Sequence, residues 1–324
     1  MTITEARPVS AVASAVAALE VCSPTTYSWM GEITELPEPV MRVSDAEGMR
    51  RALVGSIGAR LYDSFYTQGT PQPAPRDGAA RPGLDRAISH ELMAANEGAG
   101  CLEPGWRVVG EDDDQRIVQR SGLRLWVARD ELHAGADVGD IVALRLPADA
   151  PAYSPGFYIA RGDRGFVADP WVLDRFYLDL RVEGAVPFVR ETTRRLNRAG
   201  LAFLAKVADD PDGFGRRDAA VLSFERRDRP RAFAAAREIA DALAPYLDAG
   251  APAMTLPLVP GLAFAEDPGG GESFGVHRCL LLADAAVMAR ERGAMAPDDR
   301  FDVARERFAD AGISLDTPHL GGSS

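Results

Sequence analysis

Lysine is nearly absent from this chain of 324 residues. Of its 36 lysine and arginine residues, Lys206 alone is a lysine, and it lies in the stretch LAFLAKVADDP (residues 201–211). The composition is typical of high-GC coding, which replaces lysine by arginine, so one surviving lysine could reflect chance. A guanidinium keeps its proton in a protein, however, whereas a desolvated ammonium can lose one and act as a base. Lys206 is therefore a candidate for proton transfer.

Cysteine is scarce, and long apolar runs are missing. The three scattered cysteines, Cys22, Cys101 and Cys279, predict neither a disulfide framework nor a metal-binding spacing. No run of about 18 apolar residues is present, so we expect no transmembrane helix and no membrane partner. The N-terminal MTITEARP lacks the basic region of a signal peptide. These absences predict a cytoplasmic protein that uses no metal ion and no cofactor.

Positive charge is in deficit, because 48 acidic residues face 36 basic ones and give a formal net charge of −12. Binding to a phosphate backbone needs a broad basic face, so we expect no nucleic-acid partner. A small anion pocket made of clustered arginines is compatible with this charge. The hydrophobic fraction of 46% and the charged fraction of 26% are ordinary for a globular protein.

The first hundred residues have the periodicity of helices. We predict helices over residues 9–22, 45–62 and 83–97. Residues 70–83, TPQPAPRDGAARPG, are rich in proline and glycine and predict a flexible loop. Residues 1–105 are thus expected to form a mainly helical N-terminal region.

From Trp106 onward the pattern changes to alternation. The stretch WRVVGEDDDQRIVQRSGLRLWVA predicts a β-hairpin around an acidic turn. Further strands are predicted over 138–145, 155–160, 172–181, 201–207 and 218–224, and helices over 187–199, 229–248, 274–292 and 299–311. This order favours an α+β fold with a mainly antiparallel central sheet flanked by helices. We expect an α+β catalytic region over 106–312 and a tail over 313–324.

Polar side chains gather on one face of two predicted strands. Alternation places Leu204 and Lys206 on one face of their strand, and Arg175, Tyr177 and Asp179 on one face of the preceding strand. An amine on such a face is partly desolvated, which lowers its pKa. This face is either a functional site or the wet side of a half-exposed sheet.

Further cations occur where elements begin. Arg216 and Arg217 precede a strand, and Arg190 lies near the start of a helix. The segment LAFAEDPGGGESFGVHRC (residues 262–279) has a glycine-rich entry, a possible N-cap at Ser273, and then His277 and Arg278. A helix start of this kind suits an anion, although an ordinary glycine-rich connector has the same pattern.

Six stretches in order carry a resemblance to a known family: LYDSFYTQG, ELMAANEGAGCLEPGW, LDRFYLDL, LAFLAKV, RRDAAVLSF and LAFAEDPGGGESFGVHRC. From about residue 50 to 290 the chain resembles the HopA-type effector family, and more closely its bacterial biosynthetic branch. Members of that branch are phosphoserine/phosphothreonine lyases of class V lanthipeptide and thioamitide pathways. The resemblance implies a kinase-like partner that phosphorylates a precursor peptide, from which the lyase eliminates phosphate to leave dehydroalanine or dehydrobutyrine.

The residues can be assigned roles in such an elimination. Lys206 would be the base for the Cα–H, and His277 or, alternatively, Tyr177 would protonate the leaving oxygen. Arginines bind a departing phosphate bidentately. The sequence nominates Arg175, Arg190, Arg217 and Arg278 for this task.

Two other readings stay open at this point. A non-catalytic subunit could use the same arginines to present a phosphopeptide to the kinase. A secreted effector that meets a host partner is the other reading. Arginine in place of Lys206 would serve a binder but not a lyase.

Overall fold

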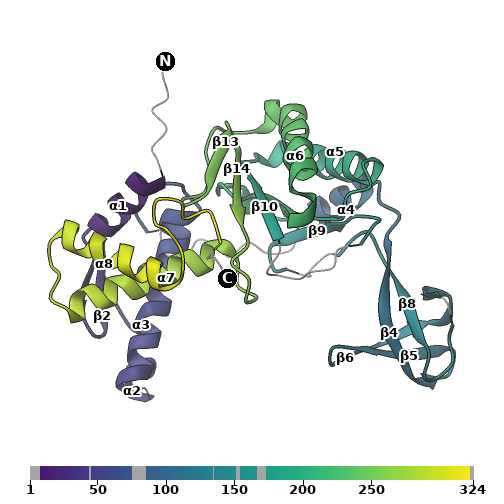
Figure 1. The fold of residues 1–324 in the computed structure, drawn as a ribbon, viewed down its shortest axis with the longest axis horizontal. Coiled ribbons are helices and arrows are strands. Elements are labelled where there is room, and N and C mark those ends of the chain that lie inside the picture. The colour runs from purple at the N-terminus through teal and green to yellow at the C-terminus, as the bar shows by residue number, and fades with distance from the viewer. Residues whose placement is uncertain are drawn as a thin grey trace.

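The structure is a computed structural model that describes residues 8–43, 45–74, 85–133, 135–150, 154–165 and 173–321. Figure 1 shows three units side by side, each built around its own antiparallel sheet. The described residues also form eight α-helices, so the predicted α+β class is confirmed. No helix among these residues is long and apolar enough to cross a membrane.

The first unit joins both ends of the chain. It contains the sheet β1 (Leu19–Ser23), β2 (Thr26–Trp29) and β3 (Glu32–Glu35), and the helices α1 (Pro8–Ala18), α2 (Glu38–Val43), α3 (Ala46–Leu61), α7 (Phe274–Glu291) and α8 (Pro297–Asp310). Figure 1 shows α7 and α8 lying against α1 and α3. Trp29, Leu53, Leu282 and Phe308 belong to their common core. The first and last parts of the sequence therefore fold together.

One sequence prediction in this unit was wrong. The helix expected over 9–22 ends at Ala18, and a strand begins at the next residue. Residues of β1 alternate between buried and exposed and pair with the aromatic strand β2. Pairing with a partner strand overrides weak local helix propensity. The N-terminal region is mainly helical, as predicted, with a small three-stranded sheet inserted after its first helix.

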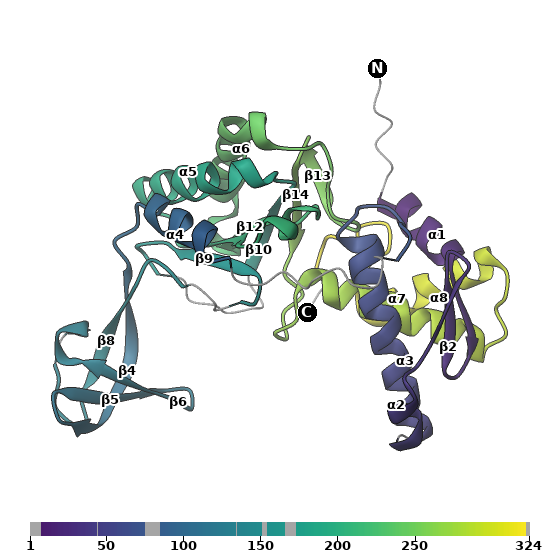
Figure 2. The ribbon, with the colours of Figure 1, turned by 180° about the vertical axis from the view of Figure 1, so that it is seen from behind.

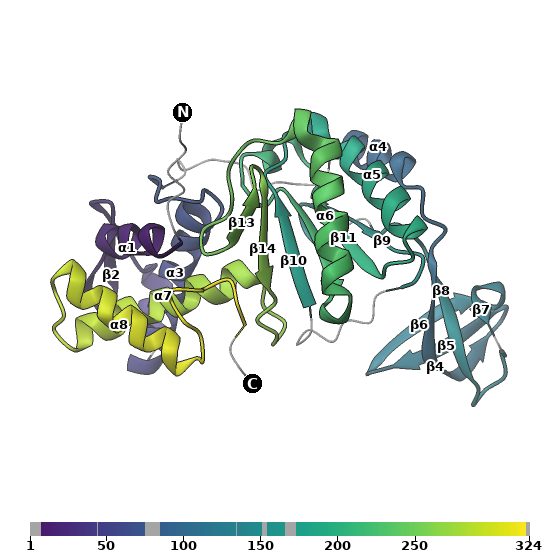
Figure 3. The same ribbon diagram turned by 45° about the horizontal axis from the view of Figure 1, so that its top comes forward.

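The central unit contains a six-stranded antiparallel sheet in the order β13-β14-β10-β12-β11-β9. Its strands are β9 (Phe157–Arg161), β10 (Leu173–Leu178), β11 (Phe203–Ala208), β12 (Ala220–Glu225), β13 (Leu256–Val259) and β14 (Leu262–Glu266). Helices α4 (Arg86–Ala95), α5 (Ala185–Arg198) and α6 (Arg229–Leu243) lie on one face of this sheet, as Figure 3 shows. Strands β13 and β14 were not predicted; they are short and separated by a tight turn.

The third unit projects away from the central sheet (Figures 1 and 2). Its strands are β4 (Cys101–Asp112), β5 (Gln115–Arg120), β6 (Leu123–Ala128), β7 (Leu132–His133) and β8 (Ile141–Leu146), in the order β6-β5-β4-β8-β7. The predicted hairpin is confirmed as β4 and β5. The boundary predicted between residues 105 and 106 falls within β4.

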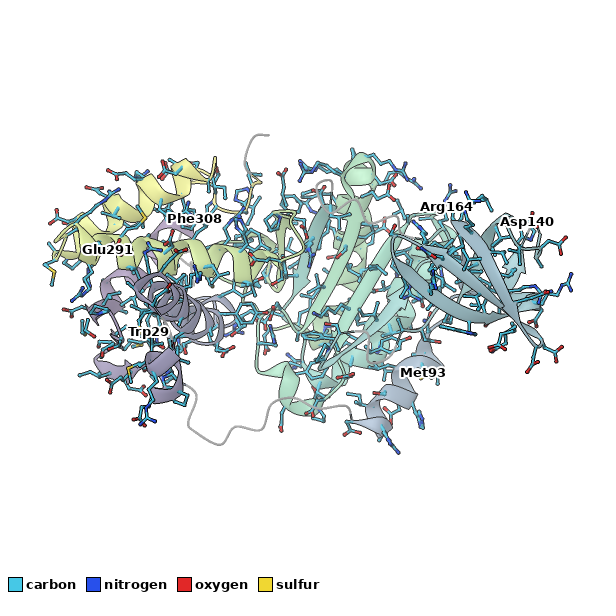
Figure 4. All side chains as sticks on the ribbon, turned by 90° about the horizontal axis from the view of Figure 1, so that it is seen from below. Trp29, Met93, Asp140, Arg164, Glu291 and Phe308 are labelled. Atoms are coloured by element: carbon cyan, nitrogen blue, oxygen red, sulfur yellow. The ribbon has the colours of Figure 1, made fainter. Side chains whose placement is uncertain are left out.

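The second face of the central sheet has no helix in front of it in Figure 4, which views the molecule from below. The face lies between the unit that carries Trp29 and Phe308 and the unit that carries Asp140. Lys206 points to this second face, because its strand neighbours Ala205 and Val207 lie in the core under the helices.

Residues 70–74 of the predicted proline-rich loop are described and form no helix or strand, whereas residues 75–83 lie outside the described part.

Candidate functional site

The predicted alternation along β10 and β11 is confirmed. Phe203, Ala205 and Val207 of β11, with Phe176 and Leu178 of β10, enter the core beneath α5 and α6. The opposite face therefore carries Leu204 and Lys206 from β11, and Arg175 and Tyr177 from β10. Tyr177 belongs to the core that the first unit forms.

Strand register fixes how far apart these side chains lie. Lys206 is paired with Val221 of β12, and Val221 is paired in turn with Tyr177 of β10. Two strand spacings therefore separate Lys206 from Tyr177, which is about 10 Å between their backbones. Long side chains on one face can meet across that distance.

The Lys206 amine is held in a partly buried position. Its Nζ lies 3.7 Å from the centroid of the Phe157 ring. Within the part of the chain that the structure describes, no carboxylate forms an ion pair with it. Burial, assisted by the like charges of Arg216 and Arg175, lowers the pKa of Lys206 to about 8, and Asp218 acts in the opposite direction.

The contact with Phe157 competes with this shift. A cation on an aromatic face gains about 0.5–1 kcal/mol when exposed and about 2 kcal/mol when desolvated, which favours the charged amine. One pKa unit corresponds to about 1.4 kcal/mol, so this contact can offset about one unit of the shift. The loss of hydration is the larger effect, so the pKa of Lys206 stays below its ordinary value.

The charge of Arg216 lowers the pKa of Lys206 more than the charge of Arg175 does. Arg216 lies 5.4 Å from the centroid of the Phe157 ring that Lys206 also contacts. It binds Asp218 through Nε at 2.5 Å and Nη2 at 2.9 Å, and Nη2 also donates to the Tyr62 hydroxyl at 2.7 Å. The phenol oxygen of Tyr62 accepts there, so its own proton can point to a ligand.

Tyr62 and Tyr66 come from a π-helical turn, Tyr62–Tyr66, at the end of α3. Their rings stack with centroids 5.3 Å apart. Tyr66 is hydrogen-bonded to Tyr177, and burial raises the pKa of both hydroxyls. π-Helical turns often occur at functional sites because they redirect neighbouring side chains. Here the turn brings two phenols from the first unit onto the central sheet.

Arg175 completes the face on the other side of Tyr177. Its Nε donates to Asp267 at 2.5 Å, and its Nη2 binds the same carboxylate. Asp267 also accepts from the amide of Gly269 at 2.9 Å. The amide of Gly269, the first glycine before α7, therefore already donates to a carboxylate of the protein. Ser273 caps α7 as predicted, accepting from the amide of Val276 at 3.4 Å.

The surroundings of His277 disfavour its protonated, positively charged form. Arg278 donates to its Nδ1 at 2.7 Å, which fixes that nitrogen as an acceptor because a guanidinium only donates. Burial and the guanidinium groups of Arg278 and Arg307 lower the pKa of His277 to about 4. The ring is thus neutral at pH 7 with its proton on Nε2, so His277 would act there as a neutral donor and not as an imidazolium acid.

Arg278 is fully buried and ties down the C-terminal segment. It donates to the carbonyl of Pro318 at 2.8 Å and to that of Leu320 at 2.7 Å. Burial lowers the pKa of Arg278 to about 10. These contacts indicate a structural role in place of the predicted phosphate contact.

The two remaining predicted arginines lie elsewhere. Arg217 binds Asp179 at 2.6 Å beyond the end of β10. Arg190 is exposed on α5, the helix that covers the opposite face of the sheet. The structure therefore brings together Lys206, Tyr177 and Arg175, and it leaves Arg190 outside the site.

Four residues of the candidate site were not predicted from the sequence: Tyr62, Tyr66, Arg216 and Asp218. All four lie in LYDSFYTQG and RRDAAVLSF, two stretches that carried the family resemblance. That resemblance was the available signal. Among the described residues, no group of three or more His, Cys, Asp and Glu side chains could hold a metal ion.

Comparison with known proteins gives one family match. A model of the HopA1 effector protein family matches residues 148–320, more than half of the chain. LYDSFYTQG and ELMAANEGAGCLEPGW lie outside this range, which also extends beyond residue 290. No curated protein matches the chain.

Two solved structures of effector proteins are similar to the chain. That from Pseudomonas syringae pv. tomato strain DC3000 has 16% sequence identity and a TM-score of 0.47, covering 84% of this chain and 99% of that one. That from Pseudomonas syringae pv. syringae strain 61 has 14% identity and a TM-score of 0.45, covering 84% and 97%.

Proposed function

The chain belongs to the HopA1 effector protein family, and we propose that it is a phosphoserine/phosphothreonine lyase acting on a phosphorylated peptide. The observation that carries this proposal is the position of Lys206. It is the chain's one lysine, it is partly buried beside Arg216 and Arg175, and its pKa is lowered to about 8. A base of this kind matches the abstraction of a weakly acidic proton near neutral pH.

In the proposed reaction the neutral Lys206 amine removes the proton from Cα of the phosphorylated residue. The electron pair of that C–H bond forms the Cα=Cβ double bond, while the Cβ–O bond breaks and phosphate leaves. The product is dehydroalanine from phosphoserine or dehydrobutyrine from phosphothreonine. The step consumes no water, oxidant or second substrate, and Lys206 is regenerated by loss of its proton to solvent.

Arg175 and Arg216 are the proposed phosphate ligands. The hydrogen bonds that each makes within the described part of the chain use Nε and Nη2, which leaves Nη1 for a ligand. A phosphorylated side chain carries close to two negative charges at pH 7. Charge-assisted bonds from two guanidinium groups would stabilise the further charge that develops as the C–O bond breaks.

Tyr62 and Tyr177 are the proposed donors to the leaving oxygen. Burial raises the pKa of both phenols, so both are protonated and neutral at pH 7. Tyr62 accepts from Arg216, one of the proposed phosphate ligands. A phenol in this position can donate to the bridging oxygen as it leaves. This assignment replaces His277 as the acid.

The decisive measurement is the mass of a synthetic phosphothreonine peptide after incubation with the protein. A lyase removes the elements of phosphoric acid, and added EDTA has no effect. Loss of the phosphoryl group with recovery of the hydroxyl would identify a phosphatase and refute the proposal. Lys206→Arg should bind the peptide but eliminate at least about 100-fold more slowly. Unchanged elimination by this variant would exclude Lys206 as the base.

The same geometry could serve a phosphopeptide-binding subunit of a kinase. The observation that favours this alternative is that Arg175 and Arg216 each keep donors for an anion whether or not Lys206 reacts. Peptide binding without elimination by the wild-type chain, tested with the partner kinase present, would support it.

For either function, we propose a kinase-phosphorylated precursor peptide as the ligand. A kinase-like gene and a short Ser/Thr/Cys-rich gene beside this one would support that pathway.

A further inference from the structure

A cavity of about 450 Å³ lies where the third unit leaves the central sheet. One wall is apolar and comes from the third unit, with Trp106, Leu123 and Leu125. The facing wall comes from the central sheet, with Ile159 of β9 and Leu204 of β11. Figure 2 shows β6 on the side of the third unit that is turned toward the middle of the molecule. The cavity is therefore bounded by two sheets.

The cavity adjoins the candidate site directly. Leu204 lies two residues before Lys206 on β11 and shares its face, and Ile159 is the strand partner of Lys206 on β9. Two residues along a strand span about 7 Å. A peptide with its phosphorylated residue at Lys206 would place residues about two to five positions away in the cavity, since an extended chain advances about 3.3 Å per residue.

Arginines outnumber acids among the described residues that line the cavity. Arg120, Arg161 and Arg164 line it, and within this described lining Glu103 is the one acidic side chain. Arg120 is paired with Glu103 at 3.0 Å, while Arg164 is exposed at the rim. Local excess of this sign stands out in a chain whose net charge is −12. It complements an acidic partner.

We propose that this cavity binds the part of the substrate peptide next to the phosphorylated residue, and that it selects an apolar side chain together with an acidic one. The proposal rests on the proposed peptide-directed function and adds a sequence preference to it. The apolar wall would bury a side chain such as leucine or phenylalanine, and Arg164 would pair with a carboxylate. Preference for the apolar side chain would then come from the wall of the third unit, preference for the acidic one from Arg164 after β9, and chemistry from the central sheet.

The test measures binding of fluorescent phosphothreonine peptides by anisotropy, using the full chain and the variants Leu123→Ser and Arg164→Glu. The reference peptide carries leucine and glutamate within five residues of the phosphothreonine, and a second peptide carries glycine and serine there. We expect Leu123→Ser to weaken binding of the reference peptide about five- to tenfold. We expect Arg164→Glu to weaken it about threefold or more, and lysine in place of the peptide glutamate to restore it.

The control variants come from β6, the strand that carries Leu123, on the face opposite to the cavity. Trp126 and Arg124 are exposed on β6 but do not line the cavity. Trp126→Ser and Arg124→Glu should leave the affinity within about twofold. Melting temperatures of all four variants show whether each is folded.

The outcomes separate this inference from the proposed function. Equal binding of both peptides, or equal losses in the cavity and control variants, overturns the cavity assignment whether or not the protein is a lyase. Selective losses at Leu123 and Arg164 without any elimination, with the partner kinase present, support the cavity and refute the lyase. Elimination whose kcat/KM for the reference peptide is unaffected by both variants supports the lyase and refutes the cavity.

Discussion

Lys206 is the residue whose protonation decides the proposed chemistry. Its pKa is lowered to about 8, chiefly by burial. The neutral amine is the active form, and its population grows as the pH rises through 8. We therefore expect kcat/KM for elimination to increase from pH 6.5 to about 8.5 and then level off. A rate that falls over this interval would contradict the role of Lys206 as base.

Two charge-removing variants test the same prediction from opposite directions. Arg216 lowers the pKa of Lys206 and Asp218 raises it. Arg216→Gln should move the rising limb of the pH–rate profile to higher pH, and Asp218→Asn should move it to lower pH, each by up to about one unit. Arg190→Gln, on the opposite side of the sheet, is the control and should leave the limb in place. Shifts of the same sign in both site variants would disprove this account of the pKa.

Strand periodicity predicted the positions of site residues within strands but not of those between them. The strand period of two correctly placed Arg175 and Tyr177 on the same face as Lys206. Arg216 and Arg217 precede β12, where no period applies, and the choice of Arg217 missed the guanidinium that meets Asp218 and Tyr62. Backbone direction outside regular elements is set by tertiary contacts.

At the scale of elements, the site depends on a close contact between α7 and the π-helical turn. A Cβ on Gly275 would lie 2.3 Å from the ring of Tyr66. Gly275→Ala should displace Tyr66 and its bond to Tyr177, reduce elimination severalfold and destabilise the fold by about 1–3 kcal/mol. Activity and thermal unfolding measure the two effects.

Gly55→Ala is the matched control for this substitution. Gly55 lies within α3, and a Cβ there would meet no atom within 4 Å. Alanine has the higher helix propensity, so this variant should be more stable by about 0.5–1 kcal/mol and remain fully active. Wild-type stability and activity in Gly275→Ala would show that the contact is not required.

At the scale of the whole molecule, the C-terminal segment is part of the fold. Ile313 and Leu315 are buried, and the segment accepts two hydrogen bonds from buried Arg278. Removing residues 313–324 should destabilise the protein by about 3–6 kcal/mol, since each buried apolar side chain contributes about 1.5–3 kcal/mol. Denaturant unfolding gives the value.

A shorter deletion serves as the comparison. Removing residues 322–324 retains the buried side chains and both carbonyl acceptors of Arg278, so the stability should stay within about 0.5 kcal/mol of the full chain. A full deletion that unfolds at the wild-type denaturant concentration would mean that these contacts are energetically neutral. The predicted tail over 313–324 includes Ile313 and Leu315, which are buried in the core of the first unit.

The sequence by itself determined the α+β class, most helices of the chain and the face on which Lys206 lies. These features follow from periodicity, which is local and visible in one stretch at a time. Only the tertiary structure decided which distant groups share the site. Tyr62 and Tyr66 reach the sheet because the first unit folds from both chain ends, and Arg278 faces carbonyls 40 and 42 residues away. Such contacts depend on how elements pack, and no pattern within a single element specifies that packing.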